Sequence, residues 1–185
     1  MLMLLKGNRY KASVIKKIQL GIFRNDFMVD RLKKFIYQVE FNTIASSMGT
    51  FSDKLKSFFN YFSKKYPTLY SDFKPERVPL EKENVIDNIA ASMYSAIKLF
   101  SPTNYTNTII VFVIQDNERN EFDQRSIEVL LWEKYNIKSV RLTLKEILNK
   151  HEIDANNNLL IDQQIVSLFY FRAGYSEKDY TDEVN

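Results

Sequence analysis

Residues 35–49 read FIYQVEFNTIASSMG and change from an alternating strand into a loop of small residues. Because successive side chains of a strand point to opposite faces, the residues at odd positions from 35 to 41 form one apolar face. Gln38, Glu40 and Asn42 form the other face, which is polar. Glu40 and Asn42 therefore direct two side-chain oxygens toward the same space, just before the chain turns.

Two readings of this polar face stay open. A carboxylate beside an amide oxygen suits a hard cation such as Mg²⁺, which binds few protein ligands and keeps its other positions for water and phosphate. The alternative is a two-faced strand with one hydrated side. Taken alone, the stretch favours this alternative, because alternating strands are common and metal sites are few.

The composition narrows the class of protein. A chain of 185 residues can form one large or two small domains. Its formal net charge of +3 comes from dispersed Lys and Arg residues, so charge gives no argument for a nucleic-acid partner. Cysteine is absent, which excludes disulfides and thiolate metal sites. The single histidine, His151, argues against histidine-based catalysis, and we expect it in a polar turn, exposed to solvent.

No stretch of the sequence is apolar for long enough to cross a membrane. The apolar start, residues 1–5, is followed at once by Lys6 and is too short for a signal sequence or a membrane span. We therefore expect a cytoplasmic protein without a membrane partner.

The pattern upstream of residues 35–42 predicts a hairpin. Its first strand starts at 19–24 and runs on through a turn or bulge at 25–26. In such a hairpin Arg24 would lie close to the polar face that carries Glu40.

Helices are predicted on both sides of a proline-containing connection at 67–81. The first begins after Gly49 with Thr50 as its cap, and its apolar stripe is expected to pack in the core. The second runs from about 81 to 100, and a further short helix is predicted at 9–18. The stripe of the first helix consists of Phe51, Leu55, Phe58, Phe59 and Phe62.

The second half of the chain predicts alternating strands and helices. Residues 108–114 (TIIVFVI) form a continuous apolar run, typical of a strand buried on both faces of a parallel sheet. A helix at 121–135 and a strand at 137–144 complete a β-α-β unit. A short helix at 146–150 and a hairpin of strands 159–161 and 165–171 follow.

The loop after the apolar strand limits what this unit can bind. Residues 115–120 contain no glycine, so the loop cannot cradle a pyrophosphate as dinucleotide sites do. It offers instead Glu118, Asn120 and, one turn on, Gln124, side chains that can bind an ammonium or an amino-acid head group. A polar capping loop is the equal alternative.

Arg172 follows the last apolar strand, and Gly174 allows the backbone to turn sharply. An arginine at such an edge can hold a carboxylate with two parallel hydrogen bonds. The alternative is a surface arginine at a strand end, and Arg24 has the same two readings.

Four segments together resemble the eukaryotic-type glutathione synthetase family. They are LGIFRNDFM at 20–28, QVEFNTIASSMG at 38–49, ERNEFDQ at 118–124 and FRAGY at 171–175. They occur in the family's order with similar spacing over almost the whole chain, and four in order are far more specific than any one of them.

The resemblance implies an α/β fold, a partial ATP-grasp-type enzyme with a three-layer β-α-β substrate-binding domain. Residues 1–103 would form part of the ATP-grasp and metal-site region, and residues 104–185 a Rossmann-like dipeptide-binding domain that is truncated at its C-terminus. The implied reaction is the ATP-dependent ligation of γ-glutamylcysteine to glycine through an acyl phosphate, with Mg²⁺ as cofactor, in a homodimer.

The same resemblance implies roles for individual residues. Glu40 and Asn42 would hold Mg²⁺, and Glu40 and Met28 would contact the nucleotide. Arg24 would be catalytic and would also contact the dipeptide. The remaining residues of the implied dipeptide site are Ile44, Ala45, Ser46, Ser47, Glu118, Arg119, Asn120, Gln124, Arg172, Ala173, Gly174 and Tyr175.

The chain departs from the family's pattern in three respects. Ala45 stands where the family commonly has serine, and Phe27 stands where it has tyrosine. The family's glycine-rich lid and third Mg²⁺ ligand lie beyond the last matched motif, so we expect a fragment that lacks ligase activity alone. The alternative is a non-catalytic relative or truncated product that only binds a dipeptide.

Overall fold

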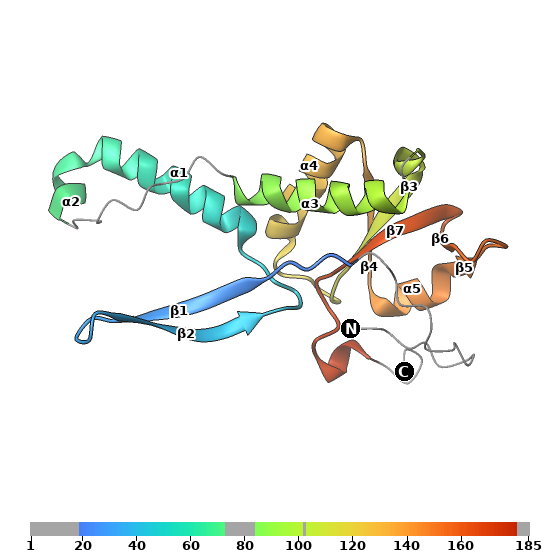
Figure 1. The fold of residues 1–185 in the computed structure, drawn as a ribbon, viewed down its shortest axis with the longest axis horizontal. Coiled ribbons are helices and arrows are strands. Elements are labelled where there is room, and N and C mark those ends of the chain that lie inside the picture. Colours follow the sequence, from blue (N-terminus) through green and yellow to red (C-terminus); the bar gives the residue numbers. More distant parts are fainter. Residues whose placement is uncertain (1–18, 73–83, 102, 181–185) are drawn as a thin grey trace.

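The computed structural model describes residues 19–72, 84–101 and 103–180, and the helix expected at 9–18 lies outside these residues. Its centre is a five-stranded mixed sheet with the strand order β4-β3-β7-β6-β5 (Figure 1). The strands are β3 (Thr108–Val113), β4 (Lys138–Leu142), β5 (His151–Ile153), β6 (Leu159–Ile161) and β7 (Gln164–Phe171).

The central strand β3 is the apolar run, and all six of its residues are buried. It pairs in parallel with β4 on one side and with β7 on the other. Helix α4 (Glu121–Tyr135) connects β3 to β4, which confirms the predicted β-α-β unit. The strand predicted at 137–144 ends at Leu142, because Thr143 caps helix α5 (Leu144–Lys150) through a capping box.

Helices cover both faces of the sheet, which gives three layers. On one face α4 and α3 (Val85–Phe100) pack against β3 and β7, and their shared core includes Met93, Ile97, Phe112, Ile127 and Leu131. On the other face α5 contributes Leu144 and Ile147 to a second core. The structure therefore confirms the α/β class.

The predicted hairpin is present as a separate two-stranded sheet, β1 (Arg24–Asp30) paired with β2 (Phe35–Asn42). The strand expected to start at residue 19 begins only at Arg24, because β2 ends at Asn42, which pairs with Arg24. The bulge expected at 25–26 lies between Asp26 and Phe27. The hairpin extends away from the five-stranded sheet (Figure 1).

Helix α1 (Gly49–Lys65) corrects two expectations. Met48 is its N-cap, in the left-handed region with φ 78°, and Thr50 is buried instead of capping the helix. The apolar stripe does not enter a core, since Phe58, for example, is 53% exposed. Helix α2 (Pro67–Asp72) replaces part of the expected loop. A helical spacing of apolar residues predicts the helix but not what covers its apolar face.

His151 is not in an exposed turn. It is the first residue of β5, it is half-buried, and its Nδ1 lies 2.7 Å from the carbonyl oxygen of Leu148. The polar sequence around it is the end of α5, where the chain enters the edge strand of the sheet without a long loop.

Asp123 on α4 connects this helix by hydrogen bonds to the start of α1 and to the residue that follows β7. Its carboxylate accepts hydrogen bonds from the backbone N–H groups of Met48 (3.1 Å) and Thr50 (2.9 Å) at the start of α1. It also accepts one from Arg172, directly after β7, at 3.2 Å. Asp123 is fully buried, so this carboxylate fixes the position of α1 against the sheet.

Asp123→Ala should lower the free energy of unfolding by about 3–5 kcal/mol, because it leaves the buried guanidinium of Arg172 without its counter-ion. Urea unfolding followed by circular dichroism measures this change. The matched control is Glu121→Ala on the same helix, which removes an exposed ion pair with Arg125 and should cost at most about 1 kcal/mol. Equal losses for the two variants would contradict the role given to Asp123.

Candidate functional site

The candidate residues of the second half meet at the carboxyl ends of β3 and β7. These strands are parallel, so their carboxyl ends lie at the same edge of the sheet. The backbone N–H of Arg172 donates to the carbonyl of Val113 at 2.8 Å, which places Arg172 beside the loop that follows β3. Ligands of such sheets bind beyond this edge.

Arg172 is 5% exposed and contacts three groups of the chain through one terminal nitrogen, Nη1. This nitrogen donates to the carbonyl of Ser46 (3.0 Å), the carboxylate of Asp123 (3.2 Å) and the hydroxyl of Tyr170 (3.2 Å). The expected ligand carboxylate is thus replaced at Nη1 by Asp123. The Nε of Arg172 is buried and has no hydrogen-bond partner in the described parts of the chain.

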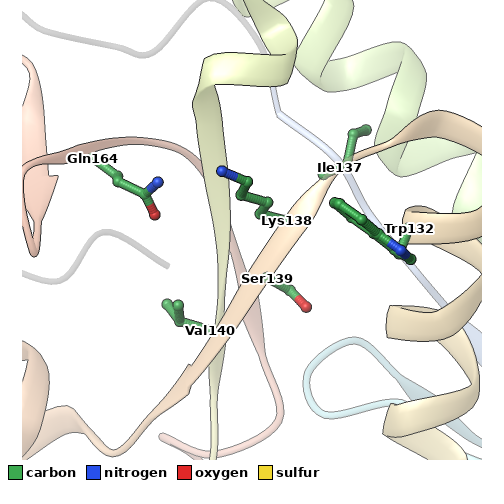
Figure 2. A pocket seen from close by; sticks show the side chains of 6 residues that line it. All are labelled: Trp132, Ile137, Lys138, Ser139, Val140 and Gln164. Carbon is green, nitrogen blue, oxygen red and sulfur yellow. The ribbon is translucent and has the colours of Figure 1, made fainter.

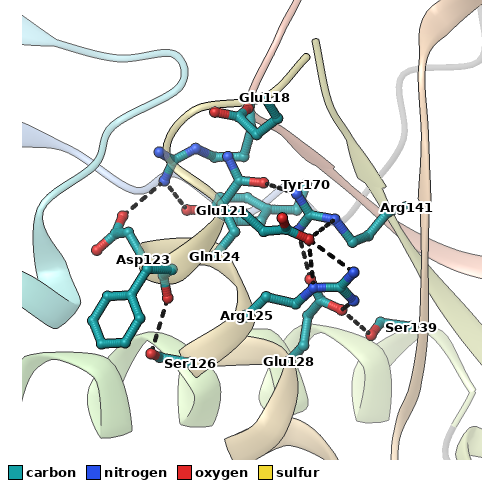
Figure 3. Close-up of polar contacts among 12 residues, drawn as sticks. Glu118, Glu121, Asp123, Gln124, Arg125, Ser126, Glu128, Ser139, Arg141 and Tyr170 are labelled. Carbon is teal, nitrogen blue, oxygen red and sulfur yellow. Dashed lines mark hydrogen bonds and ion pairs between the residues drawn. The ribbon is translucent and has the colours of Figure 1, made fainter. Parts of the chain in front are cut away.

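Gln124 provides a second buried donor at this edge. Its side chain is 0% exposed, its Oε1 accepts a hydrogen bond from Arg141 at 2.8 Å, and its Nε2 has no partner among the described residues. Figure 3 shows Asp123 and Gln124 projecting from α4 into the polar cluster that contains Tyr170 and Arg141. Burial raises the pKa of the Tyr170 phenol, so this hydroxyl stays protonated and neutral near pH 7.

The loop at 114–120 has the character of a cap as well as of a binding loop. Glu118 is half-buried, and its carboxylate accepts the backbone N–H of Asn120, the N-cap of α4, at 2.7 Å. Arg119 is exposed. One oxygen of Glu118 therefore acts as the capping alternative expects, by accepting a backbone N–H at the start of α4.

The segment 44–47 joins the hairpin to α1, and its four residues are half-buried. Ala45 is in the left-handed region with φ 53°, and Ser46 donates from Oγ to the carbonyl of Asn42 at 3.1 Å. Since the carbonyl of Ser46 accepts from Arg172, this segment lies directly against the edge of the sheet.

The residues after Arg172 form a compact turn. Gly174 has φ +92°, which explains the glycine at this position. The backbone N–H groups of Gly174 and Tyr175 donate to Asp179 at 2.9 and 3.2 Å. Ala173 is buried in the core, whereas the ring of Tyr175 is mostly exposed. Tyr175 therefore lies at the rim of the site and Arg172 in its interior.

The hairpin carries a second polar cluster. Arg24 donates through Nε and Nη2 to the two oxygens of Asp26, at 2.8 and 2.9 Å, and its Nη2 lies 3.6 Å from Glu40. The amide of Asn42 donates to Glu40 at 2.9 Å. The proximity of Arg24 to Glu40 and Asn42 is thus confirmed. Sequence reasoning missed Asp26, although its cross-strand pairing with Glu40 follows from the hairpin register.

The cluster on the hairpin has the donor chemistry for a hard cation. Both Glu40 and Asn42 carry side-chain oxygens near the C-terminal end of β2, and the side chain of Glu40 is 56% exposed. Arg24 lies beside the same carboxylates, and no group of three or more His, Asp or Glu residues suited to a metal occurs within residues 19–72, 84–101 and 103–180. Met28 is exposed on the neighbouring strand β1.

A separate hollow of about 380 Å³ lies between α4 and the edge strand β4, lined by Trp132, Ile137, Lys138, Ser139, Val140 and Gln164 (Figure 2). Lys138 and Gln164 begin β4 and β7, so the hollow lies toward the amino ends of the parallel strands. None of the residues expected to bind substrate or metal lines it.

Comparisons with known proteins agree on one family. The family model "Eukaryotic glutathione synthase" matches residues 108–185. Glutathione synthetase of Dictyostelium discoideum is 32% identical over 98% of this chain and 38% of its own length. The chloroplastic enzyme of Solanum lycopersicum is 32% identical over 91% and 30%, and the Homo sapiens enzyme is 28% identical over 92% and 35%. The chain thus spans about a third of the length of these relatives.

One solved structure shares the fold. The apo form of a glutathione synthetase-like effector from Globodera pallida superimposes with a TM-score of 0.60 and 23% identity. The alignment covers 83% of this chain and 36% of that one.

Among the helices that the structure describes, none combines the length and the apolar character needed to span a membrane.

The pKa of Asp26 should lie below its ordinary value of about 3.9, chiefly because of the hydrogen bonds from Arg24. The stability that this pair contributes is present above the ordinary pKa and is lost as the pH falls through the lowered pKa. Nuclear magnetic resonance titration of the Asp26 carboxyl measures this value. Arg24→Gln should return it toward 3.9, whereas Arg31→Gln in the hairpin turn should leave it unchanged. A normal pKa in the unaltered chain would contradict the ion pair.

Proposed function

We propose that the chain belongs to the eukaryotic glutathione synthase family and that it provides the γ-glutamylcysteine-binding region of a glutathione synthetase. The complete enzyme would join this dipeptide to glycine through an acyl phosphate formed from ATP, as a peptide-forming ligase. The chain spans about a third of its relatives' length, and further parts of the polypeptide would supply the nucleotide lid and the glycine site.

One observation carries this proposal. Arg172 and Gln124 come from different elements, both are buried at the carboxyl edge of the sheet, and each leaves one side-chain nitrogen without a partner in the described chain. An unsatisfied buried donor costs about 1–3 kcal/mol, and a bound acceptor group recovers that cost. A γ-glutamyl head group offers carboxylate and carbonyl oxygens for such donors.

The other expected residues have roles that fit this placement. Glu118 would use its second oxygen for the ammonium of the head group, with Asn120 beside it and Arg119 at the rim. The segment of Ile44, Ala45, Ser46 and Ser47 would offer backbone groups and hydroxyls from the opposite side. Ala173 and Gly174 would shape the turn that places the ring of Tyr175 over the entrance, and Arg24 would reach the dipeptide from the hairpin.

Glu40 and Asn42 would hold Mg²⁺, with Glu40 and Met28 next to the nucleotide. The metal, when bound, neutralises charge on the transferred phosphoryl group. Arg24 would then orient the carboxylate of Glu40 while remaining paired with Asp26. Because Asn42 and Ser46 are linked by a hydrogen bond, the metal ligands and the dipeptide segment hold a fixed relative position.

A second candidate is a non-catalytic dipeptide-binding relative. It is favoured by the contact of Arg24 with Glu40, because this guanidinium occupies space next to the carboxylate that the metal needs. Formation of glutathione from γ-glutamylcysteine, glycine and MgATP by the isolated chain would exclude this candidate. Binding of γ-glutamylcysteine without turnover by the isolated chain is expected of both candidates, and a reading frame that continues past Asn185 into a glycine-rich segment would favour the enzyme.

The exposed apolar surfaces support a larger assembly. The hairpin and α1 expose many large apolar side chains, among them Phe23, Phe27, Phe35, Val39, Phe41, Phe51, Leu55, Phe58 and Phe59. A two-stranded hairpin is marginal alone, and apolar patches of this kind mark surfaces that pack against other polypeptide. These faces would contact the remaining parts of a glutathione synthetase, working as a cytoplasmic homodimer.

Arg172→Lys should weaken binding of γ-glutamylcysteine by about 1.4–3 kcal/mol, because lysine keeps the charge beside Asp123 but loses the free Nε donor. Isothermal titration calorimetry of the 185-residue chain measures this loss. Arg125→Lys on α4 is the matched control and should bind like the unaltered chain. Unchanged affinity in Arg172→Lys would remove Arg172 from the site.

Glu40→Gln should abolish divalent-metal binding at the hairpin, since a neutral amide is a weaker ligand for a hard cation than a carboxylate. Broadening of the Asn42 side-chain amide resonance by Mn²⁺ provides a readout that is independent of activity. Glu152→Gln, on the distant strand β5, should leave the broadening unchanged. Equal broadening in Glu40→Gln would contradict the assignment of Glu40 as a ligand.

A further inference from the structure

The amide of Gln124 is held in a single orientation. Its Oε1 lies 2.8 Å from Nη2 of Arg141, a residue of β4. A guanidinium has only donors, so the amide oxygen has to face Arg141 and the amide nitrogen has to face away. The side chain is 0% exposed, so bulk solvent does not compete for this contact.

Arg141 is itself fixed by a buried partner. Its Nη1 donates to Glu128 at 2.7 Å, and only 9% and 10% of the two side chains are exposed. Glu128 also accepts a hydrogen bond from Ser139 of β4 at 3.3 Å, as Figure 3 shows. A short charge-assisted bond between two buried side chains leaves the guanidinium little freedom. Arg141 therefore presents the same nitrogen to Gln124 in every molecule.

The remaining donors point to the class of group that binds beside them. Nε2 of Gln124 and Nε of Arg172 are both buried without an acceptor in the chain that the structure describes. Gln124 also lies in the first turn of α4, where the helix dipole favours a negative charge. Unpaired donors beside a helix amino end favour a carboxylate over a neutral carbonyl, and they disfavour an ammonium next to Nε2 of Gln124, because both groups can only donate.

We propose that Arg141 is a positioning residue that sets specificity: by binding the amide oxygen of Gln124, it commits Nε2 to donate to the α-carboxylate of the γ-glutamyl head group. This inference rests on the proposed function. It revises the expectation that Gln124 helps to bind the ammonium, because its acceptor oxygen faces Arg141 and its nitrogen, which can only donate, faces away from Arg141. Binding of the ammonium then falls to Glu118.

The test uses calorimetry on the 185-residue chain with three probes. They are γ-glutamylcysteine, 4-aminobutyrylcysteine, which lacks the α-carboxylate, and glutarylcysteine, which lacks the ammonium. In the unaltered chain, loss of the α-carboxylate should weaken binding by about tenfold or more, since a charge-assisted hydrogen bond is lost. In Arg141→Met the amide can rotate, and this penalty should become about threefold or more smaller, the part contributed by Arg172 remaining, while the penalty for loss of the ammonium should not fall.

Arg125→Met is the matched control. Arg125 also pairs with Glu128, at 3.1 Å, but it is exposed, and it contacts Glu121 and Glu128 instead of Gln124. This variant should keep both penalties of the unaltered chain. Should Arg141→Met fail to fold by circular dichroism, the double variant Arg141→Met/Glu128→Met removes both buried charges and takes its place.

The outcomes separate this inference from the proposed function. Equal weakening of all three probes in the Arg141 variant, or an unchanged carboxylate penalty, would overturn the positioning role and leave the proposed function intact. A carboxylate penalty that falls in Arg125→Met as well would also overturn it. Failure of the unaltered chain to bind γ-glutamylcysteine would overturn the proposed function and this inference with it.

Discussion

The buried ion pair between Asp123 and Arg172 is the interaction on which the rest of the candidate site depends. Both side chains are almost fully buried, so removal of either one leaves the other as an uncompensated charge. Asp123 also accepts two backbone N–H groups at the start of α1, and Arg172 also donates to the carbonyl of Ser46. The pair therefore joins the hairpin connection, α1, α4 and the end of β7 at one point.

This arrangement explains why the buried polar atoms that Arg172 and Gln124 leave unpaired are donors rather than acceptors. Asp123 and Tyr170 satisfy one nitrogen of Arg172, and Arg141 satisfies the oxygen of Gln124. In the described chain, one side-chain nitrogen of each residue stays without an acceptor, which costs free energy when no ligand is bound. Buried polar groups are normally paired, so the orphaned nitrogens of Arg172 and Gln124, near the carboxyl ends of the parallel strands β3 and β7, are the reason to propose a ligand site there.

The sequence predicts the parts of the molecule that depend on local periodicity. The apolar run at 108–114 and the alternation at 35–42 gave the central strand and the hairpin correctly. The partners of Arg172 could not be predicted, because Asp123 is 49 residues away and no local pattern pairs them. The exposure of Phe58 could not be predicted for a similar reason. A helical stripe shows that a face is apolar, and only tertiary structure shows whether anything covers it.

The two polar clusters are mechanically coupled, although they lie in different sheets. The hairpin ends at Asn42, whose carbonyl accepts a hydrogen bond from Ser46, and the carbonyl of Ser46 in turn binds Arg172. A displacement of the hairpin, for example when a cation draws Glu40 and Asn42 together, would be transmitted through four residues of chain to the guanidinium. Among the described residues the two hairpin strands make few contacts with the five-stranded sheet. The hairpin is held at its base by this segment and by Leu20 and Ile22, which pack against the core that includes Phe112 and Tyr170. Metal and dipeptide binding would therefore affect each other reciprocally, as linked equilibria require.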